Sequence, residues 1–305
     1  MKEIVVASGK GGTGKTTVAA SLAVFLNNHG VKVFAADADV DAPDLLLALG
    51  GGKTTFSMEI KASEKARIDK EKCTKCGKCI EVCPFGAIVV QNDGRPTVVE
   101  LMCEGCGVCK LVCPSGAIEV ERAPTGTLSV EETKYGFACV TGKLRLGEHN
   151  SGHLVASVKN IGRRKAQDAG SDVFIVDAAP GIGCPVIASI TGADYVIAVT
   201  EPTPAAKRNL ERLSRVVKHF NVPAGVVMNM SGYSRDFEIA LKEWVERELG
   251  FQFLGEIPVD YEVVKALVQM KPVIDFNPDT KASKALAAIA KQVGEILWGL
   301  SGRKM

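Results

Sequence analysis

The chain has 305 residues, of which 46% are hydrophobic and 24% are charged, and its formal net charge is +2. This composition predicts a substantial buried core and excludes a wholly disordered chain. The weak basic balance gives no electrostatic basis for binding nucleic acid, which would need a concentrated basic stripe. The length allows one large domain and one small domain.

The N-terminus lacks the features of a secretion signal. Lys2 and Glu3 lead into only a short apolar run, residues 4–7. No run approaches the roughly 20 apolar residues that a membrane-spanning helix needs. We therefore expect a cytoplasmic protein whose thiols stay reduced. Ten cysteines in that compartment indicate metal binding rather than disulfides, and eight of the ten lie between Cys73 and Cys113.

The first predicted elements are a strand at residues 3–7, a glycine-rich loop at 8–15 and a helix at 16–29. A second strand, 31–36, ends in an acidic run. Later strands are predicted at 173–177, 195–200, 225–229 and 253–257, with helices near 150–169, 204–219, 235–249 and 280–299. This alternation predicts an α/β fold with a mostly parallel sheet and helices on both of its faces.

A cysteine-rich segment interrupts the alternation. The run CTKCGKCIEVCPFGAI at residues 73–88 recurs as CEGCGVCKLVCPSGAI at residues 103–118, an offset of 30 residues. We expect residues 62–122 to form an inserted small α+β domain, and residues 1–61 with 123–305 to form one discontinuous domain. Residues 127–149 contain two short alternating runs, which the pattern does not place.

The glycine-rich loop, GKGGTGKT, fits the phosphate-loop pattern G-x-x-x-x-G-K-[ST] between a strand and a helix. Glycines suit this loop because backbone N–H groups must face a phosphate without a Cβ in the way. The motif predicts that Lys15 neutralises phosphate oxygens and that the Thr16 hydroxyl binds Mg²⁺. We expect an ATP/ADP site that includes Gly9, Lys10, Gly11, Gly12, Thr13, Gly14, Lys15, Thr16 and Thr17.

The second lysine of the loop, Lys10, gives the form K-G-G-x-G-K-T, which resembles the deviant Walker A motif of the MinD/Mrp superfamily. That superfamily includes the nitrogenase iron protein, MinD, ParA-type partition ATPases and cluster-assembly ATPases. The resemblance implies a P-loop ATPase that forms a homodimer with ATP. In such a dimer Lys10 would reach the partner's phosphates and stabilise the charge that develops there.

The resemblance implies further roles at the ends of strands. Asp39, in Asp37-Ala38-Asp39, would orient the attacking water or accept its proton, and Asp37 or Asp41 would support Mg²⁺ through water. Asp177 ends the predicted strand in VFIVDAAPG and would hold Mg²⁺ through a water. The adenine site would include Asn229, Pro258, Val259 and Asp260. Two short runs, Gly147-Glu148 and Ser151-Gly152, resemble a segment of the ferredoxin-bearing branch, and the sequence assigns them no role.

Both cysteine runs match the bacterial ferredoxin pattern C-x₂-C-x₂-C-x₃-C-P. In two-cluster ferredoxins the fourth cysteine of each run binds the other cluster. The resemblance therefore implies two [4Fe–4S] clusters. Paired C-x₂-C motifs also form zinc sites, but two complete runs that each end in proline favour iron and sulfide. The expected ligands are Cys73, Cys76, Cys79 and Cys113 for cluster 1, and Cys83, Cys103, Cys106 and Cys109 for cluster 2.

Two cysteines lie outside these runs. Cys184 follows Asp177 by seven residues, and the nitrogenase iron protein has a cluster-binding cysteine at the corresponding place. Cys184 is therefore either a ligand of a cluster shared between subunits or a small packed residue near the nucleotide switch. Cys139 lies in an apolar run and is expected in the core.

Together these features predict an iron–sulfur P-loop ATPase that hydrolyses Mg-ATP and couples nucleotide state to electron transfer, with an unidentified redox or client protein as partner. The alternative is an assembly or maturation factor that carries clusters or metal centres. A MinD-like membrane-associated positioning ATPase is a third class, because the C-terminus has an apolar stripe followed by basic residues. These residues are Ile289, Val293, Ile296, Leu297, Leu300, Arg303 and Lys304.

Overall fold

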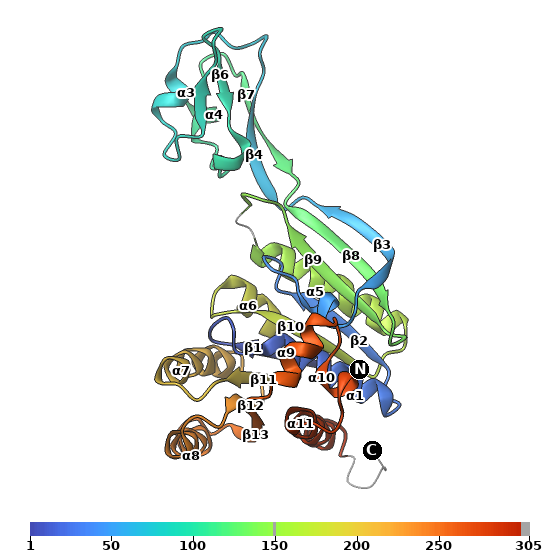
Figure 1. Ribbon diagram of the computed structural model, residues 1–305. Helices are drawn as coiled ribbons and strands as arrows, with labels where there is room; N and C mark the ends of the chain where they lie inside the picture. Colours follow the sequence, from blue (N-terminus) through green and yellow to red (C-terminus); the bar gives the residue numbers. More distant parts are fainter. Residues whose placement is uncertain (149–150, 300–305) are drawn as a thin grey trace.

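The computed structural model describes residues 1–148 and 151–299, and it consists of a large α/β part and a small lobe that stands off from one edge of the large part (Figure 1). In these residues the main sheet has nine strands in the order β13-β12-β11-β1-β10-β2-β9-β8-β3. Neighbours from β13 to β9 are parallel, whereas β8 and β3 are antiparallel. The strands are β1 (Lys2–Ser8), β2 (Val33–Ala38), β3 (Gly52–Ile60), β8 (Gly126–Thr133), β9 (Ala138–Leu144), β10 (Val173–Pro180), β11 (Tyr195–Thr200), β12 (Ala224–Ser231) and β13 (Gln252–Pro258).

The central strands are apolar on both faces because helices cover both sides of the sheet. Along β1, Ile4 and Val6 belong to one buried cluster, and Val5 and Ala7 belong to another. The first cluster includes residues of α1 (Lys15–Asn28) and α11 (Lys281–Trp298), and the second includes residues of α5 (Ser151–Asp168) and α7 (Pro204–His219). The prediction of a mostly parallel sheet with helices on its faces is confirmed.

The remaining elements of the large part are short. They are α2 (Leu45–Ala48), α6 (Cys184–Ile190), α8 (Arg235–Trp244) with the π-helical turn η2 (Val245–Leu249), α9 (Tyr261–Val268) and α10 (Val273–Phe276).

In the apolar stripe of α11, Ile289 and Val293 are buried in the first cluster and Leu297 packs against it, whereas Ile296 is exposed. Leu300, Arg303 and Lys304 lie outside the described residues. No helix in residues 1–148 or 151–299 combines the length and the hydropathy that crossing a bilayer requires.

Residues 52–60, where no strand was predicted, and residues 126–144, which lie almost wholly within the unplaced segment 127–149, extend the sheet beyond β2. Strand β8 has an inner face with buried Leu128 and Val130, so its alternating run is typical of a half-buried strand. Strand β3 pairs with β8 at the edge of the sheet and is exposed along nearly its whole length. Its sequence does alternate Phe56, Met58 and Ile60 with polar residues, and the sequence-based prediction missed this period-two signal.

The lobe begins with β4 (Ser63–Ile68) and ends with β7 (Ile118–Ala123), and these two strands form an antiparallel ribbon. Between them lie α3 (Lys78–Glu81), β5 (Ile88–Val90), β6 (Pro96–Val98), the 3-10 turn η1 (Glu100–Met102) and α4 (Val108–Leu111). The sequence repeat is also a structural repeat. Ile68 pairs with Ile118 across the ribbon. The residues at the equivalent positions of the repeat, Val98 and Ile88, also pair with each other. The lobe has its own small core, which includes several of the cysteines.

A buried ion pair connects three elements of the large part. The Lys159 ammonium on α5 lies 2.8 Å from a carboxylate oxygen of Glu3 on β1, and both side chains are 4% exposed. Arg163 binds the other oxygen of Glu3 at 2.7 Å. Lys159 also donates hydrogen bonds to the carbonyl groups of Ser189 and Thr191 at the end of α6. This ammonium therefore joins α5, α6 and β1.

Replacing Lys159 with Met should destabilise the fold by about 3 kcal/mol, because one carboxylate oxygen and several helix-end carbonyls lose a buried donor. The measurement is urea unfolding followed by circular dichroism. The control is Lys2→Met, since the Lys2–Asp194 pair is exposed at both ends and should change the free energy of unfolding by less than about 1 kcal/mol. Equal effects of the two substitutions would contradict the structural role of Lys159.

Candidate functional site

The phosphate loop connects β1 to α1 at the carboxyl edge of the sheet. Its backbone has φ of +79° at Gly12 and +84° at Gly14, a conformation that favours glycine. The Asn229 side-chain amide donates a 2.8 Å hydrogen bond to the Thr13 carbonyl. A Cβ on Gly14 would lie 2.2 Å from that amide nitrogen, so Gly14 is required sterically as well as conformationally. Asn229, expected at the adenine, thus also braces the loop.

The predicted Mg²⁺ residues meet beside Lys15. The Lys15 ammonium lies 2.9 Å from one carboxylate oxygen of Asp177, and the Thr16 hydroxyl donates to the other oxygen at 2.6 Å. Asp39 lies 3.8 Å from the same ammonium. The parallel register aligns Asp177 at the end of β10 with Asp37 on β2, which explains why residues far apart in sequence converge. Lys15 thus faces three carboxylates.

The three carboxylates around Lys15, together with burial, shift the pKa values of several groups in the site. Burial alone would lower the pKa of Lys15, but its attraction to Asp177, Asp39 and Asp37 outweighs burial and raises that pKa. Burial, together with repulsion from Asp177, raises the pKa of Asp37 well above its ordinary value. Burial raises the pKa of Asp39 to about 6, with help from Asp177 and Asp41 and against the attraction of Lys15. The site therefore favours cations.

Lys10 forms an ion pair that the sequence did not indicate. Its ammonium lies 2.7 Å from a carboxylate oxygen of Glu201, and the lysine side chain is 33% exposed. Glu201 directly follows β11. An acidic residue at the end of a third predicted strand was therefore the feature of the sequence that could have indicated this ion pair. Thr203, the N-cap of α7, also donates to Glu201. In this structure Lys10 is held within its own chain.

The predicted adenine loop follows β13. Val259 is exposed, and its amide donates to the Ser231 carbonyl. Asp260 caps α9, because one carboxylate oxygen accepts from the Glu262 amide at 3.0 Å, and its other oxygen accepts from the Ala282 amide in the first turn of α11 at 3.2 Å. Asp260 therefore has a structural role at this loop, beside Pro258 at the end of β13.

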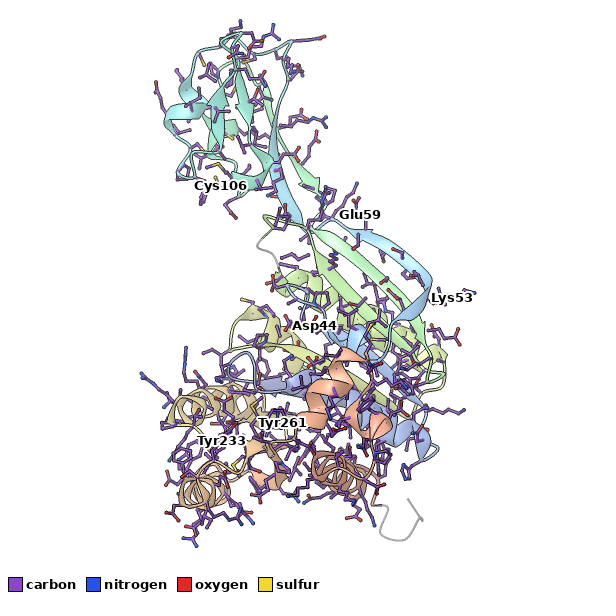
Figure 2. The ribbon with its side chains drawn as sticks, in the orientation of Figure 1. Asp44, Lys53, Glu59, Cys106, Tyr233 and Tyr261 are labelled. Carbon is purple, nitrogen blue, oxygen red and sulfur yellow. The ribbon has the colours of Figure 1, made fainter. Side chains whose placement is uncertain are left out.

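The eight repeated cysteines divide into two groups, each of which lines a separate cavity in the lobe. One cavity is lined by Cys73, Cys76, Cys79 and Cys113. The other is lined by Cys83, Cys103, Cys106 and Cys109. Each group contains three cysteines from one run and the fourth from the other run. Cys106 lies on the side of the lobe that faces the large part (Figure 2).

Backbone amides point at the sulfur atoms in both groups. The Ala87 amide donates to Cys83 Sγ and the Ala117 amide donates to Cys113 Sγ, both at 3.3 Å. Burial alone would raise the pKa of the Cys113 thiol, but hydrogen bonds from Ser115 and the following amides lower it. Such donors stabilise thiolates. In the described part of the chain, no three or more His, Cys, Asp or Glu side chains are grouped closely enough for a single metal ion.

The two remaining cysteines differ in environment. Cys139 on β9 is fully buried, as expected, and burial raises the pKa of its thiol well above the ordinary value. Cys184 is exposed at the start of α6. A Cβ on Gly152 would lie 3.0 Å from the Cys184 Cβ, so the first turn of α5 packs closely against this cysteine.

Comparisons with known proteins identify the large part. Residues 4–273 match the model of the CobQ/CobB/MinD/ParA nucleotide binding domain. An uncharacterized protein of Methanocaldococcus jannaschii is 31% identical over 295 residues, which cover 97% of each chain. An iron-sulfur cluster carrier protein of Aquifex aeolicus is 26% identical over 96% of this chain and 67% of its own length. The septum site-determining protein MinD of Pyrococcus horikoshii, solved with Mg-ADP, has a TM-score of 0.59 at 19% identity, covering 97% of this chain and 96% of its own.

The raised pKa of Asp39 predicts how the stability of the nucleotide-free protein depends on pH. A carboxyl group with a pKa of about 6 when folded and an ordinary value of 3.8 when unfolded binds its proton more tightly in the folded state. Its stabilising contribution is therefore complete below about pH 3.8 and is lost as the pH rises through 6. The Asp39→Asn variant has no carboxyl group to ionise at this position, so it does not lose this stability as the pH rises. The difference in free energy of unfolding between Asp39→Asn and wild type, measured with urea, should grow in favour of the variant from pH 5 to pH 7. A difference that is constant over this range would contradict the burial of Asp39.

Proposed function

Because the chain belongs to the CobQ/CobB/MinD/ParA nucleotide-binding family of P-loop ATPases, we propose that it hydrolyses Mg-ATP and couples its nucleotide state to electron transfer through two [4Fe–4S] clusters. One observation carries this proposal. The same chain has a formed phosphate loop and, in a lobe inserted after β3, two complete groups of four cysteines that each line a cavity.

Nucleotide binding would replace the contacts that now occupy the phosphate loop. Lys15 would leave Asp177 for the β- and γ-phosphate oxygens, and the Thr16 hydroxyl with Asp177 would hold Mg²⁺. This exchange is favourable because Mg²⁺ supplies the positive charge that the three carboxylates lack. Asp39, near the freed ammonium, would orient the attacking water or accept its proton. Asn229, Pro258, Val259 and Asp260 would form the adenine side of the site.

Lys10 has a separate role in the proposed homodimer. Its ammonium is partly exposed and its ion pair with Glu201 lies within one chain, so it is available to exchange partners. In an ATP-bound dimer it would release Glu201 and reach the phosphates of the partner subunit, where it would stabilise developing charge. Glu201 would hold the lysine within its own subunit until that dimer forms.

The two groups of cysteines fit [4Fe–4S] clusters better than single ions. Each group combines three cysteines of one run with the fourth of the other, which is the ligand set of two-cluster ferredoxins. Zinc sites also use four cysteines, but two complete runs that each end in proline favour iron and sulfide. Amide donors to Cys83 and Cys113 suit thiolates that carry negative charge. A bound cluster would supply one-electron transfer.

A second candidate is an iron–sulfur carrier or maturation factor. It is favoured by the similarity to the cluster carrier protein of Aquifex aeolicus. Eight ligands in two complete sets suit clusters that are retained rather than passed on, so we place electron transfer first. Transfer of iron and sulfide from the loaded protein to an apo-ferredoxin would favour the carrier. Retention of the clusters in that assay, with reversible reduction, would favour electron transfer.

Anaerobic purification followed by iron and sulfide analysis tests the cluster assignment. We expect about eight irons and about eight sulfides per chain, because each cluster contains four of each. Cys76→Ala and Cys106→Ala each remove one ligand of a different group and should each lower the iron content by about half. A protein that holds zinc in place of iron would contradict the electron-transfer half of the proposal.

Nucleotide turnover and cluster binding should be separable by mutation. Lys15→Ala removes the main phosphate ligand and should lower ATP turnover by at least about 100-fold. Lys10→Ala should also abolish turnover, although the phosphate loop of each subunit stays intact. The iron content of both variants should equal that of wild type, measured by the same metal analysis. Loss of iron in either variant would show that the lobe and the ATPase part do not fold as separate units.

A further inference from the structure

The lobe meets the large part at a polar junction. Strand β4 follows β3 and strand β7 precedes β8, and the Thr125 hydroxyl accepts hydrogen bonds from the amides of Ala62 and Ser63 where the strands cross over. A large open cavity lies beside this crossing. Its wall includes Lys65, Cys103 and Glu148, so one of the proposed cluster ligands borders the junction.

Glu148 connects the large part to that ligand. One carboxylate oxygen lies 3.0 Å from the Lys65 ammonium, and the other accepts a hydrogen bond from the Ser63 hydroxyl. The Lys65 ammonium also donates to the Cys103 carbonyl at 2.9 Å. The side chains of Lys65 and Glu148 are only 13% and 11% exposed, so solvent screens this pair less than a surface pair. Gly147 makes a second contact, because a Cβ there would lie 2.6 Å from Leu101 Cγ.

The residue after Lys65 contacts the sulfur of the same ligand. The Ala66 amide donates to Cys103 Sγ at 3.4 Å. The equivalent residue in the repeat, thirty positions later, is Pro96, which lines the other cavity and has no N–H group. Arg95, in the place of Lys65, donates to Lys70 and pairs with Asp93, both within the lobe. The contacts of Glu148 therefore reach one of the two groups of cysteines.

Glu148 is linked to the nucleotide site through helices α5 and α6. It precedes α5 by three residues, and Gly152 in the first turn of α5 packs against Cys184 of α6. Lys159 fixes the other end of α6 to α5. Helix α6 begins four residues after the end of β10, the strand that carries Asp177. A displacement of the segment after Asp177 would therefore be transmitted to α5 and Glu148, because packed helices move together.

We propose that Glu148 is a positioning residue that transmits the nucleotide state to the cluster site of Cys83, Cys103, Cys106 and Cys109, and not to the site of Cys73, Cys76, Cys79 and Cys113. A movement of Glu148 shifts Lys65 and changes the hydrogen bond from the Ala66 amide to Cys103 Sγ. Hydrogen bonds to ligand sulfurs set the reduction potential of a cluster. This inference rests on the proposed function and names the cluster that responds.

The test compares wild type, Glu148→Gln and Glu59→Gln, each with ADP and with a non-hydrolysable ATP analogue. Glu59 is a matched control, since it is an exposed acid beside the junction that pairs only weakly with Lys61 and Arg145 (Figure 2). Amide hydrogen exchange of residues 63–68 is compared with that of the equivalent residues 93–98. Redox titration measures both cluster potentials, and ATP turnover and iron content are measured in every sample.

In wild type we expect residues 63–68, but not 93–98, to exchange at different rates in the two nucleotide states, and one of the two potentials to shift. Glu148→Gln should lose both differences, with turnover and iron content unchanged, and Glu59→Gln should retain them. Retention of both differences in Glu148→Gln, or their equal loss in Glu59→Gln, would overturn the inference. Iron-free wild type would instead refute the proposed function, and the exchange measurement would still decide whether Glu148 links the two parts.

Discussion

The ion pair between Lys15 and Asp177 is the interaction on which the nucleotide site depends. It joins the phosphate loop to the end of β10, and the Thr16 hydroxyl binds the same carboxylate. Around it lies a buried excess of negative charge, because Asp37 and Asp39 face the same ammonium. Buried carboxylates without enough cations are costly. A cation bound among these carboxylates would therefore stabilise the site.

The parallel sheet is the reason why these groups meet. Strands β1, β10 and β2 lie side by side in one direction, so the loops that follow them emerge at one edge. Helices on both faces bury the strands and fix their ends. The ammonium of Lys159 adds a specific bond between β1, α5 and α6. The elements that carry Asp177 are thereby connected to α5, which leads back to the junction with the lobe.

The lobe obeys a different constraint, because it is too small to fold around a large apolar core. Its buried cluster consists of a few aliphatic residues and the cysteines themselves. Small domains of this kind commonly need a metal centre for stability. The near-exact repeat gives both groups of cysteines the same glycine-capped helices and the same amide donors to sulfur. The repeats differ at a few positions, such as Pro96 in place of Ala66. The Ala66 amide donates to a cysteine sulfur, whereas Pro96 has no N–H group to donate.

The sequence by itself determined the β–α alternation, the phosphate loop and the paired cysteine runs, because each depends on residues that are close together in the chain. The prediction missed the edge strand β3 and left residues 127–149 unplaced, because short alternating runs indicate strands but do not specify which strands they pair with in a sheet. Tertiary structure alone decided that Glu201 binds Lys10, that Asn229 braces the loop at Thr13, and that Glu148 contacts Lys65. These contacts join residues from 83 to 216 positions apart, and only the packing of strands and loops brings such distant residues within bonding distance.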